Sequence, residues 1–289
     1  TGDGSKLNPF KTIGYAINYG FGKSLYPTIH INSGTYSGVN NTNLTFSNLG
    51  NLTLVGEGYN KVLIDGQNKD RFLDFGTYTN VILRNLTFVN GYSGSYNNGK
   101  YFGFNIPNLK IKDCIISNCN QSYGGCVLSS SNAPIIDNLT YINNFGHLEV
   151  NHAIINNSYF ANNSGQGNGG AIYAINLTVL NSKFINNRVV GLSQSYNVEG
   201  GAIYTQIGLY SENNIYESNY AQASSGAVYV FNSNFAILIN DTFINNSAKN
   251  YGAASLNVGI YSSNAGEPNC TIKGVKFIII RLLMMVGLY

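Results

Sequence analysis

Residues 162–187 read NNSGQGNGGAIYAINLTVLNSKFINN and combine a double glycine, an apolar run, an Asn-Leu-Thr triplet and a Phe-Ile-Asn-Asn ending. The same features return along the chain, with GGAIY at 200–204 and SGAVY at 225–229. An aromatic residue followed two positions later by paired asparagines is found at 141–144, 160–163, 184–187 and 243–246. Equivalent positions lie about 20–30 residues apart, which is typical of a solenoid built from stacked repeats.

Within each repeat, apolar and polar residues alternate as they do in a β-strand. In residues 176–184, Leu177, Val179 and, after a slip in the alternation, Phe184 fall on the expected inward side. A repeat this short holds two or three strands and tight turns, and leaves no length for a crossover helix. We therefore predict an all-β fold, a single-stranded right-handed parallel β-helix (solenoid). An antiparallel sandwich with Asn-rich hairpins is the alternative, although it requires no fixed order of motifs.

The recurring asparagines and glycines are explained by the bends between strands. Both residue types tolerate the left-handed backbone conformation of a tight bend. Stacked Asn side chains also hydrogen-bond to each other along the axis, as in cross-β amide ladders. These turn and ladder roles are assigned to Asn163, Asn187, Asn219, Asn246, Gly170, Gly201, Gly226 and Gly252. The aromatic residue before each Asn pair is expected to point into the core.

Residues 1–276 are interpreted as one domain. The chain has 289 residues, of which 44% are hydrophobic and only 10% charged, where about a quarter is typical. Residues 7–20 are predicted to form a capping helix, because Phe10, Ile13 and Ile17 share one face at helical spacing. A solenoid needs such a cover over the exposed core of its first coil.

The last residues, 277–289, read FIIIRLLMMVGLY and do not continue the repeat. The stretch is too short to span a bilayer and Arg281 interrupts it, so we expect no membrane insertion. Restoring one lost base in a T-rich codon run converts it to FYNNKATDDGGAIY, which has the repeat pattern. We interpret the tail as an aberrant, frameshifted repeat.

Several segments carry a family resemblance. They are TGDGSKLNPFKTIGYAINYG at 1–20, GTYSG at 34–38, LTLVGEGYNKVLIDGQ at 52–67 and VILRNLTFVNG at 81–91. Together these segments resemble the start of pectate-lyase-like right-handed β-helices, and they are similar to the adhesin-like, Asn/Thr-rich surface proteins of methanogenic archaea. The GGAI and FxNN pair also resembles the repeats of chlamydial polymorphic membrane proteins. The resemblance implies a β-helix, whereas many activities share this scaffold.

The acidic residues do not form a recognisable catalytic group. Only Asp65, Asp70 and Asp74 are close in sequence, with Arg71 and Arg84 nearby. Asp65 lies in an LIDG turn, a context that suits aspartate. A glycosidase needs paired carboxylates, and a lyase of this scaffold needs a calcium site. We assign no catalytic, cofactor-binding or metal residues, and calcium enters only if the chain is a lyase.

We interpret the histidines and cysteines without a catalytic or metal-binding role. His30, His147 and His152 are interpreted as ordinary solvent-exposed side chains. The cysteine spacing does not fit a zinc site. Small buried thiols filling core positions are expected, with a disulfide as the alternative, at Cys114, Cys119, Cys126 and Cys270.

Two further features concern the surface. Sequons recur, and the candidate glycosylation sites are Asn43, Asn85, Asn120, Asn162 and Asn269. Tyrosines are abundant, for example Tyr204 and Tyr229, and their rings either stack against sugars or pack on the coil surface. We favour surface packing.

Function is predicted from composition and repetition. A net charge of +3 without a basic cluster argues against nucleic-acid binding. We predict a non-enzymatic, extracellular, adhesin-like rod, monomeric, that binds a cell-surface glycan or protein. Loops at 91–100 and 188–199 are the expected recognition elements. A carbohydrate-active enzyme of pectate-lyase or polygalacturonase type is the alternative, and a truncated fragment without present function is a further one.

Overall fold

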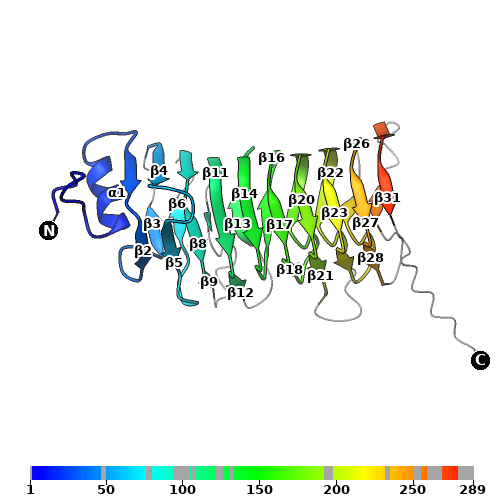
Figure 1. The fold of residues 1–289 in the computed structure, drawn as a ribbon, viewed down its shortest axis with the longest axis horizontal. Coiled ribbons are helices and arrows are strands. Elements are labelled where there is room, and N and C mark those ends of the chain that lie inside the picture. Colours follow the sequence, from blue (N-terminus) through cyan, green and yellow to red (C-terminus); the bar gives the residue numbers. More distant parts are fainter. Residues whose placement is uncertain are drawn as a thin grey trace, which may run out of the picture.

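The chain forms an elongated stack of parallel coils (Figure 1). The computed structural model describes residues 2–46, 50–75, 80–93, 104–105, 108–121, 126–130, 133–191, 198–231, 235–249, 255–258 and 269–278. The strand pairings among these residues are parallel and join each coil to the next, as in the pair β19–β22. The predicted all-β solenoid is confirmed, and the antiparallel sandwich is excluded. Its right hand stays a prediction, favoured by the crossover preference of parallel strands.

Two long ladders run the length of the rod. The first ladder contains β1 (Thr28–Ile31), β4 (Leu52–Gly56), β7 (Asn80–Arg84), β11 (Asn108–Ser117), β14 (Ile135–Ile142), β16 (Ala153–Asn156), β19 (Ile172–Leu180), β22 (Ile203–Glu212), β26 (Phe235–Ile239) and β30 (Asn269–Lys273). The second ladder contains β2 (Gly34–Ser37), β5 (Val62–Asp65), β8 (Thr87–Val89), the ends of β11 and β14, β17 (Tyr159–Ala161), β20 (Lys183–Ile185), β23 (Ile215–Glu217), β27 (Thr242–Ile244) and β31 (Lys276–Ile278).

A third ladder and a set of short strands complete the coil. The third ladder contains β3 (Leu44–Phe46), β6 (Leu73–Phe75), β10 (Phe104–Asn105), β13 (Cys126–Ser130), β15 (His147–Val150), the starts of β19 and β22, β25 (Val228–Val230) and β29 (Leu256–Val258). The short strands are β9 (Tyr92–Ser93), β12 (Asn120–Gln121), β18 (Ser164–Gly165), β21 (Arg188–Val189), β24 (Tyr220–Ala221) and β28 (Ser247–Ala248).

From β7 to β27, each coil turns twice at single left-handed residues. The first bend, between the first and second ladders, has positive φ at Asn85, Asp113, Asn138, Asn157, Asn181, Asn213 and Asn240. The second bend, after the second ladder, has positive φ at Asn90, Asn118, Asn143, Asn162, Asn186, Ser218 and Asn245. Asparagine dominates because its short polar side chain lowers the cost of this conformation.

The residue that follows the second bend points inward and forms what we call the Asn ladder: Asn144, Asn163, Asn187, Asn219 and Asn246, all buried. At Asn187 the side-chain Oδ1 accepts from the backbone N–H of Asn163 at 3.2 Å and from its Nδ2 at 2.9 Å. The Asn187 Nδ2 donates to the carbonyl oxygen of Phe160 and to Asn219 Oδ1, each at 3.0 Å. Each amide thus satisfies polar groups of both neighbouring coils.

Beside the Asn ladder runs an aromatic column made of Tyr141, Phe160, Phe184, Tyr216, Phe243 and Phe277. Its members up to Phe243 are buried, with Phe184 0% exposed. The Phe160 and Phe184 rings lie 4.8 Å apart and nearly parallel, and Tyr216 and Phe243 lie 4.7 Å apart. The inward direction predicted for these aromatic residues is confirmed. Because such stacking needs equal height on successive coils, the column and the ladder fix the same register.

The two residues of each double-glycine motif are glycine for different reasons. Positive φ occurs at the first residue, with 76° at Gly169 and 69° at Gly200. At the second residue space is the constraint. A Cβ on Gly170 would overlap the carbonyl oxygen of Gly201, and one on Gly201 would overlap that of Gly226. Gly252 lies outside the described residues.

The cap is shorter than predicted. Helix α1 spans Ile13–Phe21, so the prediction of a helix over 7–20 is wrong for its first turns. Pro9 disfavours helical geometry in the residue before it, and Thr12 is extended with φ −134°. Ile13 and Ile17 are buried against the first coil as predicted. Phe10 lies before the helix, with its ring 4.9 Å from Tyr15 and 4.8 Å from Tyr19.

Two cysteines occupy inward bend positions. Cys114 and Cys119 are buried and free, which confirms the expectation of small core thiols. Burial raises the pKa of each thiol to about 12. Cys270 is exposed, so the same expectation is wrong there, because its strand β30 has a coil on one side only among the described residues. The side chain of Cys126 is outside the described part.

The regular coil extends slightly past the predicted boundary at residue 276. Phe277 and Ile278 belong to β31, and the Phe277 ring stacks 5.1 Å from Phe243. Residues 279–289, the rest of the proposed frameshifted tail, lie outside the described residues.

Replacing one amide of the Asn ladder tests its contribution to stability. Asn187→Ala leaves the Asn163 N–H and the Phe160 carbonyl buried without these hydrogen bonds, at about 1–3 kcal/mol each. We expect the free energy of unfolding, measured in urea, to fall by about 3 kcal/mol or more.

The matched control is Asn186→Gly, one residue earlier. Asn186 is exposed and has φ 58°, a conformation that glycine adopts freely. Its loss of stability should stay under about 1 kcal/mol. Equal losses in the two variants would contradict the assigned roles.

Candidate functional site

The most distinctive surface feature is the tyrosine row on the outer face of the third ladder: Tyr173, Tyr204 and Tyr229. Each is the last residue of a GGAIY-type motif, and the preceding residue in the strand, such as Ile203, points into the core. The alternation of a β-strand therefore turns the tyrosines outward. Tyr173 and Tyr204 stack at 5.2 Å with 10° between their planes, and Tyr204 and Tyr229 at 5.5 Å with 5°.

Polar groups converge on the tyrosine hydroxyls. Gln206 donates a hydrogen bond from Nε2 to the Tyr173 hydroxyl. A hydrogen bond joins the side chains of Asn168 and Tyr204. The Oδ1 of Asn168 also accepts from the Glu199 N–H at 2.9 Å. Burial raises the pKa of the Glu199 carboxyl, and a hydrogen bond with Tyr229 partly opposes this. Burial also raises the pKa of Tyr173. The result is a rim of hydroxyl, amide and carboxyl groups.

The ring faces of the row are not free. Tyr204 is 6% exposed and Tyr229 3%, so both the faces and the edges of these rings are almost fully buried. Phe231 extends the row, with its ring 6.4 Å from that of Tyr229, and the residue is 37% exposed. A ligand can therefore reach the exposed Phe231 and the half-buried Tyr173, Glu199 and Gln206, but not the central tyrosines.

His147 closes the other end of the row, and its predicted exposure is wrong. Its ring stacks 5.8 Å from that of Tyr173 and is buried. Burial lowers the imidazole pKa from 6.5 to about 4. The residue lies directly before the inward Leu148, and the following coil covers it. Sequence spacing gives no sign of that cover.

The other histidines fit the prediction of exposed side chains. His30 on β1 is exposed. His152 is also exposed, at a bend with φ 52°, and its Nδ1 lies 3.0 Å from Asn176 Nδ2. Within the described ranges, no three His, Cys, Asp or Glu side chains come together as metal ligands would.

The acidic residues considered as candidate catalytic groups accept hydrogen bonds that stabilise turns and bends. Asp65 Oδ1 accepts from the Gln67 N–H at 2.8 Å and from Asn90 Nδ2 at 3.0 Å. Asp70 Oδ2 accepts from the Thr42 hydroxyl at 2.7 Å. These contacts match the turn role expected for Asp65. Asp74 lies on β6, in the third ladder.

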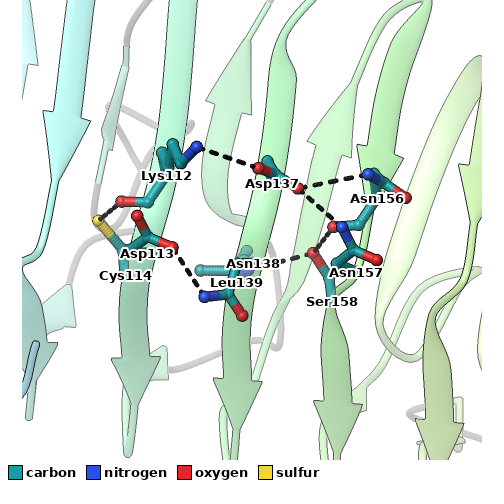
Figure 2. Close-up of polar contacts among 9 residues, drawn as sticks. All are labelled: Lys112, Asp113, Cys114, Asp137, Asn138, Leu139, Asn156, Asn157 and Ser158. Atoms are coloured by element: carbon teal, nitrogen blue, oxygen red, sulfur yellow. Dashed lines mark hydrogen bonds and ion pairs between the residues drawn. The ribbon is translucent and has the colours of Figure 1, made fainter.

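Two further carboxylates lie on adjacent coils at the first bend (Figure 2). Asp113 Oδ1 accepts from Asn138 Nδ2 at 2.7 Å. Asp137 accepts from Asn157 at 3.2 Å and forms an ion pair with Lys112 at 3.7 Å. Both carboxylates are held by groups of the neighbouring coil, an arrangement that joins coils at the surface.

The candidate sequons lie in different settings. Asn43 and Asn120 are exposed, whereas Asn85 is half-buried. Asn162 is exposed, and its Nδ2 donates to Asn143 Oδ1 at 3.2 Å, so a glycan would replace one of the two hydrogens of a nitrogen that already contacts the preceding coil. The side chain of Asn269, on β30, is outside the described part.

The predicted recognition loops are partly strand. Tyr92–Ser93 forms β9 and Arg188–Val189 forms β21, so these parts of the 91–100 and 188–199 assignments are wrong. Residues 94–100 and 192–197 lie outside the described residues. Glu199 ends the second segment and reaches the tyrosine row. Sequence reasoning missed Tyr173, Gln206 and Glu199, although the GGAIY repeat itself signals an outward tyrosine on each coil.

Neither protein-family models nor curated proteins nor solved structures give a match to this chain. In the described part of the chain, no helix has the length and apolarity that crossing a membrane requires.

The buried imidazole predicts a pH dependence of stability. The folded-state pKa of His147, about 4, is below its ordinary 6.5, so the unfolded chain binds the proton first. Stability is full above about pH 6.5 and is lost as the pH falls toward 4, by roughly 3 kcal/mol. Urea unfolding of the wild type and of His147→Gln should therefore diverge in this window.

The comparison of the two proteins isolates this effect. Burial raises the pKa of the Glu199 and Asp241 carboxyls, so these groups favour the folded state at low pH. They are present in both proteins and cancel in the difference. Parallel stability curves from pH 7 to 4 would show that the His147 ring is not buried.

Proposed function

We propose that the chain is a non-enzymatic, extracellular, adhesin-like stalk or binding module that presents its surface to a cell-surface glycan or protein. The observation that carries this proposal is the unbroken axial run of the Asn ladder and the aromatic column. It makes the coil stack stiff and holds surface groups at a constant rise of about 4.8 Å per coil. Rigid spacing of this kind suits display.

The surface at the bends also supports a display role. Asn162 Nδ2 donates to Asn143 Oδ1, and Asn186 Nδ2 donates to Asn162 Oδ1, both at 3.2 Å. Such rows expose amide donors and acceptors with no net charge. Neutral amides hydrogen-bond to sugar hydroxyls and to peptide groups alike, and salt screens these contacts less than it screens ion pairs.

Within this frame, the rim of the tyrosine row is the proposed contact area. Its exposed aromatic ring at Phe231, together with the Glu199 carboxyl and the Gln206 amide, gives the mixture of apolar and convergent polar groups typical of ligand sites. Aromatic rings of this kind also pack against the apolar faces of sugars. The glycan class is proposed on that chemistry.

A panel of immobilised cell-surface glycans tests the proposal. We expect binding of the wild type, with a loss of about tenfold or more in the double variant Glu199→Gln, Phe231→Ala. The control is Tyr159→Ala, which removes an exposed ring on the second ladder. Equal weakening by the control would place binding elsewhere.

Two results would overturn the proposal. Release of unsaturated ends from polygalacturonate in the presence of calcium would make the chain a lyase of the pectate-lyase type. Failure to bind glycans or cell-surface proteins, in a protein shown to be folded, would favour a fragment without present function.

A further inference from the structure

A cavity of about 690 Å³ lies at the N-terminal end of the rod, between residues 4–12, α1 and β1. Figure 1 shows α1 at the N-terminal end of the coil stack. The volume is within the range of ligand pockets, about 300–1,000 Å³. All residues of β1, from Thr28 to Ile31, line the cavity. We call it the edge groove.

One wall of the edge groove is an open strand edge. Among the described strands, β1 pairs with β4 only. The Thr53 N–H donates to the Pro27 carbonyl, and the Glu57 N–H to the Ile31 carbonyl. Backbone direction alternates along a parallel strand, so the N–H and C=O groups of Thr28 and His30 face away from β4. They point to the side on which the groove lies.

Helix α1 covers the core without filling this edge. A Cβ on Gly20 would meet Pro27 Cβ at 2.9 Å and Ile29 Cδ1 at 3.0 Å. The last turn of the helix is therefore pressed against the inward side of β1. A helix offers no ladder of backbone groups to a strand edge, so the β1 edge can still accept another strand.

The charged lining of the groove favours an anionic ligand. Lys6 and Lys23 line it, and of the lining residues Glu57 is the only carboxylate. Glu57 Oε2 already accepts from the Ser33 N–H at 2.8 Å and from its hydroxyl at 2.7 Å. These bonds, with smaller contributions from Lys61 and Lys6, hold the pKa of Glu57 below its ordinary value, so the lining carries two ammonium groups against one carboxylate. Phe10 and Tyr19, whose rings lie 4.8 Å apart, add an aromatic wall.

We infer that the edge groove binds an extended acidic peptide segment of a partner protein as an additional strand on β1. Backbone hydrogen bonds to Thr28 and His30 would supply affinity, as in other strand-addition complexes. Contacts with Lys6 and Lys23 would select acidic side chains, and the aromatic wall would pack against apolar ones. The four residues of β1 correspond to about 13 Å of added strand. This inference is independent of glycan binding at the tyrosine row.

The probe for this site is a fluorescein-labelled hexapeptide of alternating glutamate and valine. Fluorescence anisotropy should give a micromolar Kd for it, and much weaker binding of the matching lysine–valine peptide. A copy of the acidic probe N-methylated on alternate residues should not bind, because it cannot donate to the β1 edge. Hydrogen exchange on the complex should protect the amides of Thr28 and His30.

Charge-reversal variants locate the site. Lys6→Glu combined with Lys23→Glu should weaken the acidic probe at least tenfold, whereas Lys183→Glu, exposed on the second ladder, should not. The inference is overturned if the acidic probe does not bind. It is also overturned if the N-methylated probe binds as tightly as its parent, or if the control variant weakens binding equally.

Discussion

The structure depends on hydrogen bonds to the backbone polar groups that are buried at the bends of each coil. A backbone that bends inside a solenoid leaves N–H and C=O groups away from water, each costly if unbonded. At the second bend the solution is an asparagine directly above an asparagine, as in the pair Asn187 and Asn219. Each Asn side chain hydrogen-bonds to polar groups of the preceding and the following coil, so the bend of one coil is stabilised by both neighbouring coils.

The Asn–Asn hydrogen bonds fix the axial position of each bend, but they do not fix the number of residues between successive bends. The bonded equivalents Asn144 and Asn163 are 19 residues apart, whereas Asn187 and Asn219 are 32 apart. The additional residues of the longer coil lie between β21 and β22, and residues 192–197 of that stretch are outside the described part of the chain. Glu199 is positioned at the end of that additional segment, against the tyrosine row. Variable segments on a rigid stack are where recognition can change without loss of the fold.

Much of the fold was predictable, because repetition and alternation are local properties. Phe184 faces inward in the sequence pattern and in the structure, and the Asn pair marks the bend. Cys119 was less predictable as a ladder residue, since nothing in its type shows that it lies beneath Asn144. The burial of His147 comes from the next coil, which sequence spacing does not reveal. The convergence of Gln206 and Glu199 on the tyrosine row depends on coil lengths that the sequence leaves open.

Equivalent residues stand one coil apart, however many residues separate them in the sequence. Spin-label distances along the outer face of the second ladder test it most directly. Thr35, Thr140, Lys183 and Thr242 share one row of register partners. In a protein freed of its native cysteines, the distance from Thr35 should rise by about 9.6 Å from Thr140 to Lys183, and by the same amount from Lys183 to Thr242. Unequal steps, or distances that follow sequence separation, would contradict the stacked register.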